Sequence, residues 1–243
     1  MNFELMKEAF PQLMGGVPDA LLLIVSSLAI GFVLALILAQ MRLSSNRLLN
    51  RVAYAYVYVF RSTPLLVQIF LIYYGSGQFR GLLQDIGLWP LFRESWFCAI
   101  AALTMNTGAY TSEIIRGGIQ SVPHGQIEAG RAVGMSTLQL FRRVIFPVAI
   151  RQALPAYGNE IILMVKSTSL ASTITILEVT GIAKKIIAAT FAPVEIFIIA
   201  GGIYLTLNFV VTRGIMMLER YLSPQLYKDR DQRRGTIATL PAR

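Results

Sequence analysis

The stretch from residue 121 to residue 147, SVPHGQIEAGRAVGMSTLQLFRRVIFP, decides how the rest of the chain is interpreted. It is the longest polar and small-residue interval in a chain that is 55% hydrophobic and only 14% charged. Gly134 is a helix stop signal, and Ser136 with Gln139 forms a capping-box pattern. Pro147 lies beyond the second helix. The stretch therefore predicts a short helix, a glycine turn and a second helix, with no side-chain set able to do catalysis.

Long apolar runs flank this stretch on both sides, and the mean hydropathy of the chain is +0.58. Soluble domains usually contain about a quarter charged residues. The apolar excess is too great for one soluble core, and a bilayer is where it can be buried. The runs predict spans at about residues 17–41, 54–75, 96–115, 155–177 and 194–218. The predicted fold class is an all-α integral membrane protein with five transmembrane helices.

The distribution of positive charge gives these spans an orientation. The connection after the first span holds Arg42, Arg47 and Arg51 and no acid, and the interval 116–151 holds five arginines and a single acid. Cytoplasmic loops carry such an excess of Lys and Arg. The N-terminus is therefore predicted outside, the C-terminus in the cytoplasm, and residues 121–147 in the cytoplasm between the third and fourth spans. The net charge of +9 thus follows membrane topology and indicates no nucleic-acid partner.

Three segments are expected along the chain. Residues 1–16 are an outer-side interfacial lead-in, that is, a short amphipathic helix that lies at the membrane surface before the first span and ends near Pro11. These residues lack the basic start of a cleavable signal peptide. Residues 17–220 form the five-helix domain, which includes an outer loop at 178–193. Residues 221–243 are a basic cytoplasmic tail that can touch anionic lipid headgroups.

Two prolines bear on where spans begin. Pro64 interrupts the second span, which is either broken there into two helices or kinked. In both cases Arg61 is expected to snorkel toward the cytoplasmic headgroups. Pro155 is expected in the first turn of the fourth span, a position that tolerates proline.

Polar residues inside the spans need partners. Asn106, Tyr110 and Glu113 lie at i, i+4 and i+7, so they share one face of the third span. Lys166 lies about 16 Å into the fourth span, near the midplane. Ionisable residues there should face protein or a water-filled cavity. Two interpretations stay open, a lining of a translocation path or a polar helix–helix seam in which Lys166 pairs with Glu113 or Glu160.

Several chemistries have no basis in this composition. The single Cys98 excludes an internal disulfide and a thiolate metal cluster, and one His makes a histidine metal site unexpected. The chain also lacks the G-x-x-x-x-G-K-[ST] phosphate loop, so it cannot bind and hydrolyse ATP by the usual device. A five-helix subunit with charged mid-membrane residues and no internal repeat is not expected to be a complete transporter, and a membrane partner should complete it.

The residues EAGRAVG followed by VIFP resemble the EAA loop of bacterial ATP-binding-cassette importer permeases. That pattern is EAA, three residues, Gly, nine residues, then I-x-L-P. Three positions depart from it in small ways: Gly130 replaces the third-position Ala, Val144 replaces Ile and Phe146 replaces Leu. FRSTPLLVQIFLIYYG, AYTSEIIRGGIQSVPHGQIEAG and LPAYGNEIILMVKSTSLAS extend the resemblance over roughly residues 17–220, to permeases for polar amino acids, with histidine, basic-amino-acid and opine permeases most similar.

The resemblance implies that the loop is a coupling helix seated in a groove on a separate ATPase. Small Ala129, Gly130 and Ala132 leave room for a close approach to this helix. ATP and Mg²⁺ are then held by the ATPase, with no cofactor in this chain. The other implied partners are a second permease, identical or a sister chain, a periplasmic or surface substrate-binding protein, and the lipid of the bacterial inner membrane. The implied coupling residues are Glu128, Ala129, Gly130, Gly134 and Pro147.

A zwitterionic amino acid in a membrane cavity needs a cation for its carboxylate and acceptors for its amine. Lys166 with its neighbouring hydroxyls is the predicted carboxylate end, and the polar face of the third span is the predicted amine or side-chain end. Which amino acid or opine is carried, and which of the two permeases holds the site, stay open. The predicted substrate path comprises Gln68, Tyr73, Asn106, Thr107, Tyr110, Glu113, Lys166, Ser167 and Ser169.

Two other function classes stay as alternatives. An ion-coupled secondary transporter or channel subunit would also be polytopic with buried charges, but it often shows inverted repeats, which are absent here. A membrane-embedded enzyme has little chemistry to build on, because the sequence shows no nucleophile arrangement.

Overall fold

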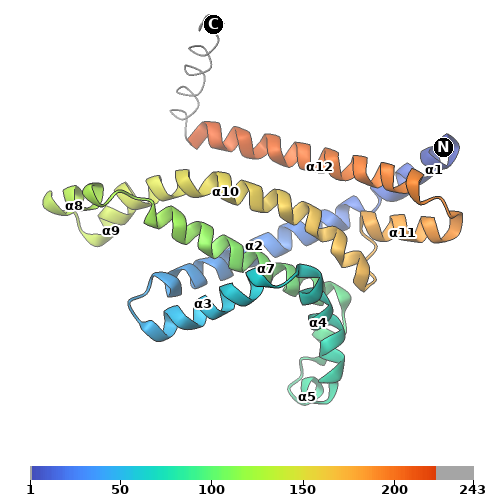
Figure 1. The fold of residues 1–243 in the computed structure, drawn as a ribbon, viewed down its shortest axis with the longest axis horizontal. Coiled ribbons are helices and arrows are strands. Elements are labelled where there is room, and N and C mark those ends of the chain that lie inside the picture. Colours follow the sequence, from blue (N-terminus) through green and yellow to red (C-terminus); the bar gives the residue numbers. More distant parts are fainter. Residues whose placement is uncertain (1, 223–243) are drawn as a thin grey trace, which may run out of the picture.

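The structure, a computed structural model, describes residues 2–222, and within that range all regular structure is helical (Figure 1). Most of the predicted tail, residues 223–243, lies outside the described residues. In chain order the elements are α1 (Phe3–Met14), α2 (Val17–Leu43), α3 (Arg47–Ser62), α4 (Leu65–Gln78), α5 (Arg80–Asp85), α6 (Trp89–Phe92), α7 (Ser95–Gln120), α8 (His124–Ala132), α9 (Thr137–Leu140), the π-helix η1 (Phe141–Ile145), α10 (Phe146–Ser167), the 3₁₀-helix η2 (Thr168–Ile174), α11 (Val179–Thr190) and α12 (Pro193–Leu222).

Helices α2 and α7 form the centre of the molecule, and α3, α4 and α10 pack against α7. Two glycines allow α2 and α7 to approach closely. A Cβ on Gly31 would lie 2.4 Å from Thr107 Cγ2, and a Cβ on Gly108 would lie 2.8 Å from Leu34 Cδ2. Small residues at such crossings are typical of membrane helix pairs.

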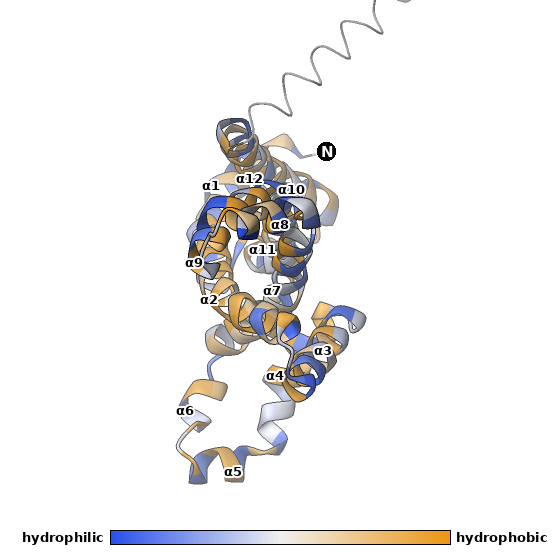
Figure 2. Ribbon diagram, turned by 90° about the vertical axis from the view of Figure 1, so that its left-hand side faces the viewer, coloured by the Kyte–Doolittle hydropathy of each residue, from blue (hydrophilic) through white to orange (hydrophobic). Residues whose placement is uncertain are grey.

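The two ends of the molecule differ in composition. The hairpin of α8 and α9 stands at one end, and α1, α11 and the start of α12 lie at the other (Figure 1). Figure 2 views the molecule from the α8–α9 end, where hydrophilic residues gather on α8. Along α2 and α12 the outward surface is apolar: Val25 is 64% exposed and Leu205 is 73% exposed. Such a surface needs lipid or a partner to cover it.

The predicted second span is broken into two helices. α3 and α4 meet at an angle of 104°, with Pro64 as the residue before α4. This confirms the first of the two alternatives for Pro64.

The predicted place of Pro155 in the first turn of its helix is wrong. The helical run continues from Thr137 through η1, α10 and η2 to Ile174, with Pro155 inside α10. Pro147 is also not beyond the second helix but in the first turn of α10. The Phe146 N–H bonds to the Phe141 carbonyl five residues back, so the wider π turn carries the helix past Pro147, which has no N–H to donate.

Two predictions at the α1–α11 end of the molecule are also corrected. α1 does not end near Pro11 but continues to Met14, because a proline removes only one backbone donor. The predicted loop 178–193 contains the helix α11. Glu178 caps it, accepting hydrogen bonds from the N–H groups of Thr180 at 2.9 Å and Gly181 at 3.0 Å.

By length and hydropathy, Phe3–Leu43 and Pro193–Leu222 are candidate membrane spans. Two bent helix pairs, Arg47–Ser62 with Leu65–Gln78 and Thr137–Ile174 with Val179–Thr190, can each add one, which gives two to four spans among residues 2–222. The predicted third span lies on α7, which is 26 residues long but too rich in polar residues to belong to this set.

Candidate functional site

The α8–α9 hairpin has the predicted local geometry. Gly134 joins the two helices with φ +78°, in the left-handed region that favours glycine. The capping box is formed: the Gln139 N–H donates to Ser136 Oγ at 3.3 Å, and the Ser136 N–H donates to Gln139 Oε1 at 3.0 Å. Both bonds satisfy donors that a helix start leaves unpaired.

Gly130 faces into this hairpin. It is buried, and a Cβ there would lie 2.6 Å from Leu140 Cδ1. The room left by this glycine is thus used by Leu140 of the same chain. The predicted close approach of another protein at this position is therefore replaced by internal packing.

The outer surface of the hairpin is open. Glu128 and Ala129 are exposed on α8, and the apolar side chains of Val133 and Leu138 are 73% and 66% exposed. Exposed apolar groups rimmed by charge mark contact surfaces. Pro147 lies half-buried at the point where the hairpin joins α10.

Two of the predicted path residues, Gln68 and Asn106, stabilise the break between α3 and α4 by hydrogen bonds. The Asn106 side-chain amide donates to Gln68 Oε1 at 3.0 Å and to the Phe60 carbonyl at 3.3 Å. The Gln68 amide donates to the same carbonyl at 2.8 Å and to Thr63 Oγ1 at 2.8 Å. The last carbonyls of a helix have no partner within it, so these amides satisfy the end of α3.

Tyr110 lies next to them and contacts Arg61. The Tyr110 hydroxyl donates to the Arg61 carbonyl at 3.4 Å, and the Arg61 guanidinium lies 5.1 Å from the centre of the Tyr110 ring. The guanidinium thus packs against α7, and the predicted snorkelling of Arg61 to the headgroups stays a prediction.

Glu113 is paired with two cations. One carboxylate oxygen lies 3.2 Å from Arg42 Nε, and the other lies 2.6 Å from an Arg116 guanidinium nitrogen. Arg42 also donates to Asn50 Oδ1 at 2.7 Å. The Glu113 side chain is 15% exposed. This group of charges joins the end of α2, the start of α3 and α7.

Lys166 and Glu160 lie apart from this group. Glu160 is 7% exposed. Lys166 is exposed, and among residues 2–222 no carboxylate lies within 4.0 Å of its ammonium. The alternative pairing of Lys166 with Glu113 or Glu160 is therefore not formed in the described chain.

The other predicted path residues have varied surroundings. The Thr107 side chain is buried in the α2–α7 contact, and its hydroxyl has no hydrogen-bond partner. Ser169 Oγ donates to the Lys166 carbonyl at 2.7 Å, and Ser167 is half-buried. Tyr73 packs on the central core and against Tyr74. The structure thus brings Gln68, Asn106 and Tyr110 together and leaves Glu113, Lys166 and Tyr73 separate.

One buried polar group had no signal in the sequence. The Glu178 carboxylate is fully buried, caps α11 and accepts a hydrogen bond from the Tyr204 hydroxyl on α12. Tyr204 also lies 3.1 Å from Thr180 Oγ1. Glutamate is not a usual helix cap, so no local pattern marked this residue.

Solved structures share this arrangement of helices. An amino acid ABC transporter solved with histidines superposes with a TM-score of 0.80 at 35% identity, over 91% of this chain and 99% of that one. The inward-facing MetNI methionine ABC transporter superposes with a TM-score of 0.70 at 20% identity, over 87% and 96%. The fold and the exposed hairpin therefore define a membrane subunit of an ABC transporter.

Residues 18–223 match the family described as binding-protein-dependent transport system inner membrane component, and the chain belongs to that family. The nopaline transport system permease protein NocM of Agrobacterium fabrum is 65% identical over 226 residues, covering 93% of this chain and 94% of the relative. The octopine transport system permease protein OccM of Rhizobium meliloti is 56% identical over 92% and 91% of the two chains. The histidine/lysine/arginine/ornithine permease protein HisM of Escherichia coli K12 is 46% identical over 81% and 82%. The chain is a transport component of the inner membrane rather than an enzyme.

Proposed function

We propose that this chain is the permease subunit of an importer that moves an opine or a basic amino acid into the cytoplasm, driven by a separate ATPase. The similarity to NocM, OccM and HisM supports this substrate range. The observation that carries the proposal is the exposed α8–α9 hairpin, whose outer surface the rest of the described chain leaves uncovered.

The ATPase docks on the outer face of α8. Glu128 and Ala129 make the polar contact, and Val133 and Leu138 supply apolar area. Gly134 sets the angle of the hairpin, while Gly130 and Pro147 connect it to α10. ATP and Mg²⁺ are held by the partner, and no cofactor belongs to this chain. Movement of the ATPase moves α10 because the helical run from the hairpin into α10 is continuous.

The membrane domain covers residues 17–220, with five spans on α2, α3–α4, α7, α10 and α12. The N-terminus and the lead-in 1–16 lie outside, and the C-terminus with the basic tail lies in the cytoplasm. Three arginine-bearing positions at the same end of the helices support this orientation: Arg42, Arg116 and Arg142. α7 is about 39 Å long, enough to cross the hydrocarbon core.

The path for substrate lies along the polar face of α7 and the end of α10. Lys166, with Ser167 and Ser169, binds the substrate carboxylate, because its ammonium lacks a carboxylate partner among the described residues. Tyr110 faces the amine end, and Thr107, buried against α2, supports this part of α7. Gln68, Tyr73 and Asn106 form the wall of the path at the α3–α4 break. Glu113 marks the inner end, where Arg42 and Arg116 engage its carboxylate.

Three further partners complete the transporter. A second permease, identical or a sister chain, forms the other half of the path and covers apolar faces such as that of α12. A periplasmic or surface binding protein delivers the substrate on the side of α1 and α11. Membrane lipid surrounds the remaining apolar surface.

The test uses the complete transporter reconstituted in proteoliposomes with ATP inside and labelled nopaline, arginine or histidine outside. Glu128→Lys should abolish ATP-driven uptake or lose the ATPase on purification. Glu94→Lys is the matched control, because Glu94 is an exposed acid before α7, far along the chain from the hairpin. If Glu128→Lys retains assembly and coupled uptake as Glu94→Lys does, the docking role is wrong.

A further inference from the structure

The segment that follows Lys166 is the 3₁₀-helix η2, which connects α10 to the chain leading into α11 (Figure 1). A run of seven residues is long for this helix type, because its hydrogen-bond geometry is poorer than that of an α-helix. η2 ends at Thr175, whose φ of +73° lies in the left-handed region, an unfavourable conformation for a β-branched residue. Contacts from other parts of the chain must therefore stabilise η2.

Two serine hydroxyls along η2 bond back onto its backbone. Ser169 Oγ donates to the Lys166 carbonyl at 2.7 Å, and Ser172 Oγ donates to the Ser169 carbonyl at 2.7 Å. Side chains three residues apart lie on the same face of a 3₁₀-helix. The two hydroxyls therefore form a row on one face of η2 that leads from Ser172 back to the backbone of Lys166.

Lys184 on α11 holds the outer end of this row. Its ammonium donates to Ser172 Oγ at 2.8 Å, although the two residues are 12 positions apart. A hydroxyl oxygen that accepts a hydrogen bond from a cation is polarised, which strengthens the bond that the same hydroxyl donates, here to the Ser169 carbonyl. Three hydrogen bonds in sequence thus connect α11 to the backbone of Lys166.

The helix that carries Lys184 is tied to the rest of the molecule. The Glu178 carboxylate caps α11 and accepts a hydrogen bond from the Tyr204 hydroxyl on α12. A Cβ on Gly181 would overlap the Ile176 carbonyl oxygen, so the first turn of α11 lies directly against the chain that leaves η2. α11 is therefore a support that is attached to α12 and packed against the outer end of η2.

The helix type of η2 decides where Lys166 lies relative to this support. A 3₁₀-helix rises about 2.0 Å and turns about 120° per residue, against about 1.5 Å and 100° in an α-helix. Over the seven residues of η2, a change to α-helical geometry would shorten the segment by about 3.5 Å and rotate its two ends against each other by about 140°. Because the outer end is held at α11, such a change would move Lys166.

We propose that Lys184 is a positioning residue for Lys166. By holding Ser172, it keeps η2 in its 3₁₀ form and so fixes the depth and the direction of the Lys166 ammonium in the path. The inference rests on the function proposed above, in which Lys166 binds the substrate carboxylate. Lys184 acts through Lys166 and does not bind the substrate itself.

The experiment measures the efficiency of ATP-driven uptake of labelled nopaline, arginine or histidine by the reconstituted transporter at saturating binding protein. Lys184→Met removes the donor and keeps a long side chain, and Ser172→Ala removes the acceptor. Each should lower the uptake efficiency by about threefold to tenfold, the range for one lost hydrogen bond, and the double variant should lower it no further. Lys184→Arg, which retains N–H donors, should keep most of the uptake efficiency.

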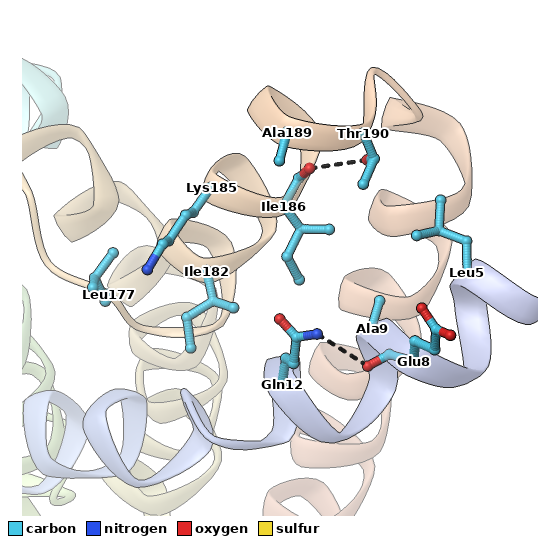
Figure 3. Close-up of a pocket in the computed structure, with 10 residues that line it drawn as sticks. All are labelled: Leu5, Glu8, Ala9, Gln12, Leu177, Ile182, Lys185, Ile186, Ala189 and Thr190. Carbon is cyan, nitrogen blue, oxygen red and sulfur yellow. Dashed lines mark hydrogen bonds between the residues drawn. The ribbon is translucent and has the colours of Figure 1, made fainter.

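Lys185→Met is the matched control. Lys185 is the next residue on α11, but it lines the pocket between α1 and α11 (Figure 3), because consecutive residues of a helix point about 100° apart. This variant should leave the uptake efficiency unchanged. An equal loss in Lys185→Met would overturn the proposal, because any positive charge on α11 would then serve. Weaker attachment of the binding protein in Lys184→Met would also overturn it, because Lys184 would then be a contact for that protein.

The Lys166→Gln background separates positioning from a general structural role. If Lys184 acts through Lys166, Lys184→Met adds no further loss of uptake to that of Lys166→Gln, whereas losses that multiply overturn the proposal. A loss in Lys166→Gln without one in Lys184→Met also overturns it and leaves the proposed function intact. If Lys166→Gln retains full uptake, the proposed role of Lys166 is wrong, and the positioning role of Lys184 is wrong with it.

Discussion

Arg42 at the end of α2 lies 3.2 Å from Glu113 on α7, although the two residues are 71 positions apart in the chain. Arg116, one turn along α7, binds the other carboxylate oxygen at 2.6 Å. The Arg42–Glu113 pair joins the end of α2 to α7, and Arg116 holds the same carboxylate from within α7. The α7 helix leads from this point directly into the hairpin at which we propose the ATPase docks.

Glu113→Gln should lower the stability of the permease by about 1–3 kcal/mol, because it leaves two partly buried guanidinium groups short of a negative partner. The KM for opine and basic substrates should stay within about twofold, since we place the carboxylate on the arginines and not on substrate. Thermal unfolding of the purified complex and uptake kinetics measure the two effects. A large rise in KM with unchanged stability would instead show that the Glu113 carboxylate contacts the substrate.

Asn106→Ala should lower the free energy of unfolding by about 1–3 kcal/mol, because the Gln68 and Phe60 oxygens at the α3–α4 break each lose a hydrogen-bond donor. Asn159→Ala is the control, as Asn159 is an exposed asparagine on α10. Thermal unfolding of both variants tests this. Equal midpoints would mean that water replaces Asn106 without cost.

Gly130→Ala should destabilise the hairpin by about 1 kcal/mol, because the added methyl displaces Leu140 from its buried position. Gly125→Ala, on the same helix and facing open space, should be neutral or stabilising by up to about 1 kcal/mol.

A double-mutant cycle with Leu140→Ala separates crowding from helix propensity. The Gly130→Ala and Leu140→Ala pair should be more stable than the sum of the single effects, as measured by unfolding and by retention of the ATPase. Additive effects would exclude contact between the two positions.

Lys166→Gln should reduce the uptake efficiency for opine and amino-acid substrates by about tenfold or more, since one charge-assisted hydrogen bond to the substrate carboxylate is worth about 1.5–3 kcal/mol. Lys7→Gln, which removes an exposed lysine from α1, should have no effect. Uptake is measured at saturating binding protein, so that delivery does not limit it. An unchanged uptake efficiency in Lys166→Gln would show that Lys166 does not bind the substrate.

The features that the sequence predicted well are those whose causes are local. Gly134 turns the hairpin, Ser136 and Gln139 cap the next helix, and Pro64 breaks the second span. Each depends on the backbone preferences of a few adjacent residues. Proline was a weaker guide inside long helices: Pro155 sits within α10, where packing against α7 and α12 outweighs one lost hydrogen bond.

By itself, the sequence determined the helical membrane class and the family resemblance, because composition and motif spacing do not depend on how distant segments meet. The tertiary structure alone decided that Glu113 pairs with Arg42, that Gln68 and Asn106 satisfy the end of α3, and that Glu178 caps a helix in a predicted loop. Each of these side chains could have faced substrate, lipid or protein. The partner that reaches it comes from another part of the chain, and only the packing of the helices brings the two within bonding distance.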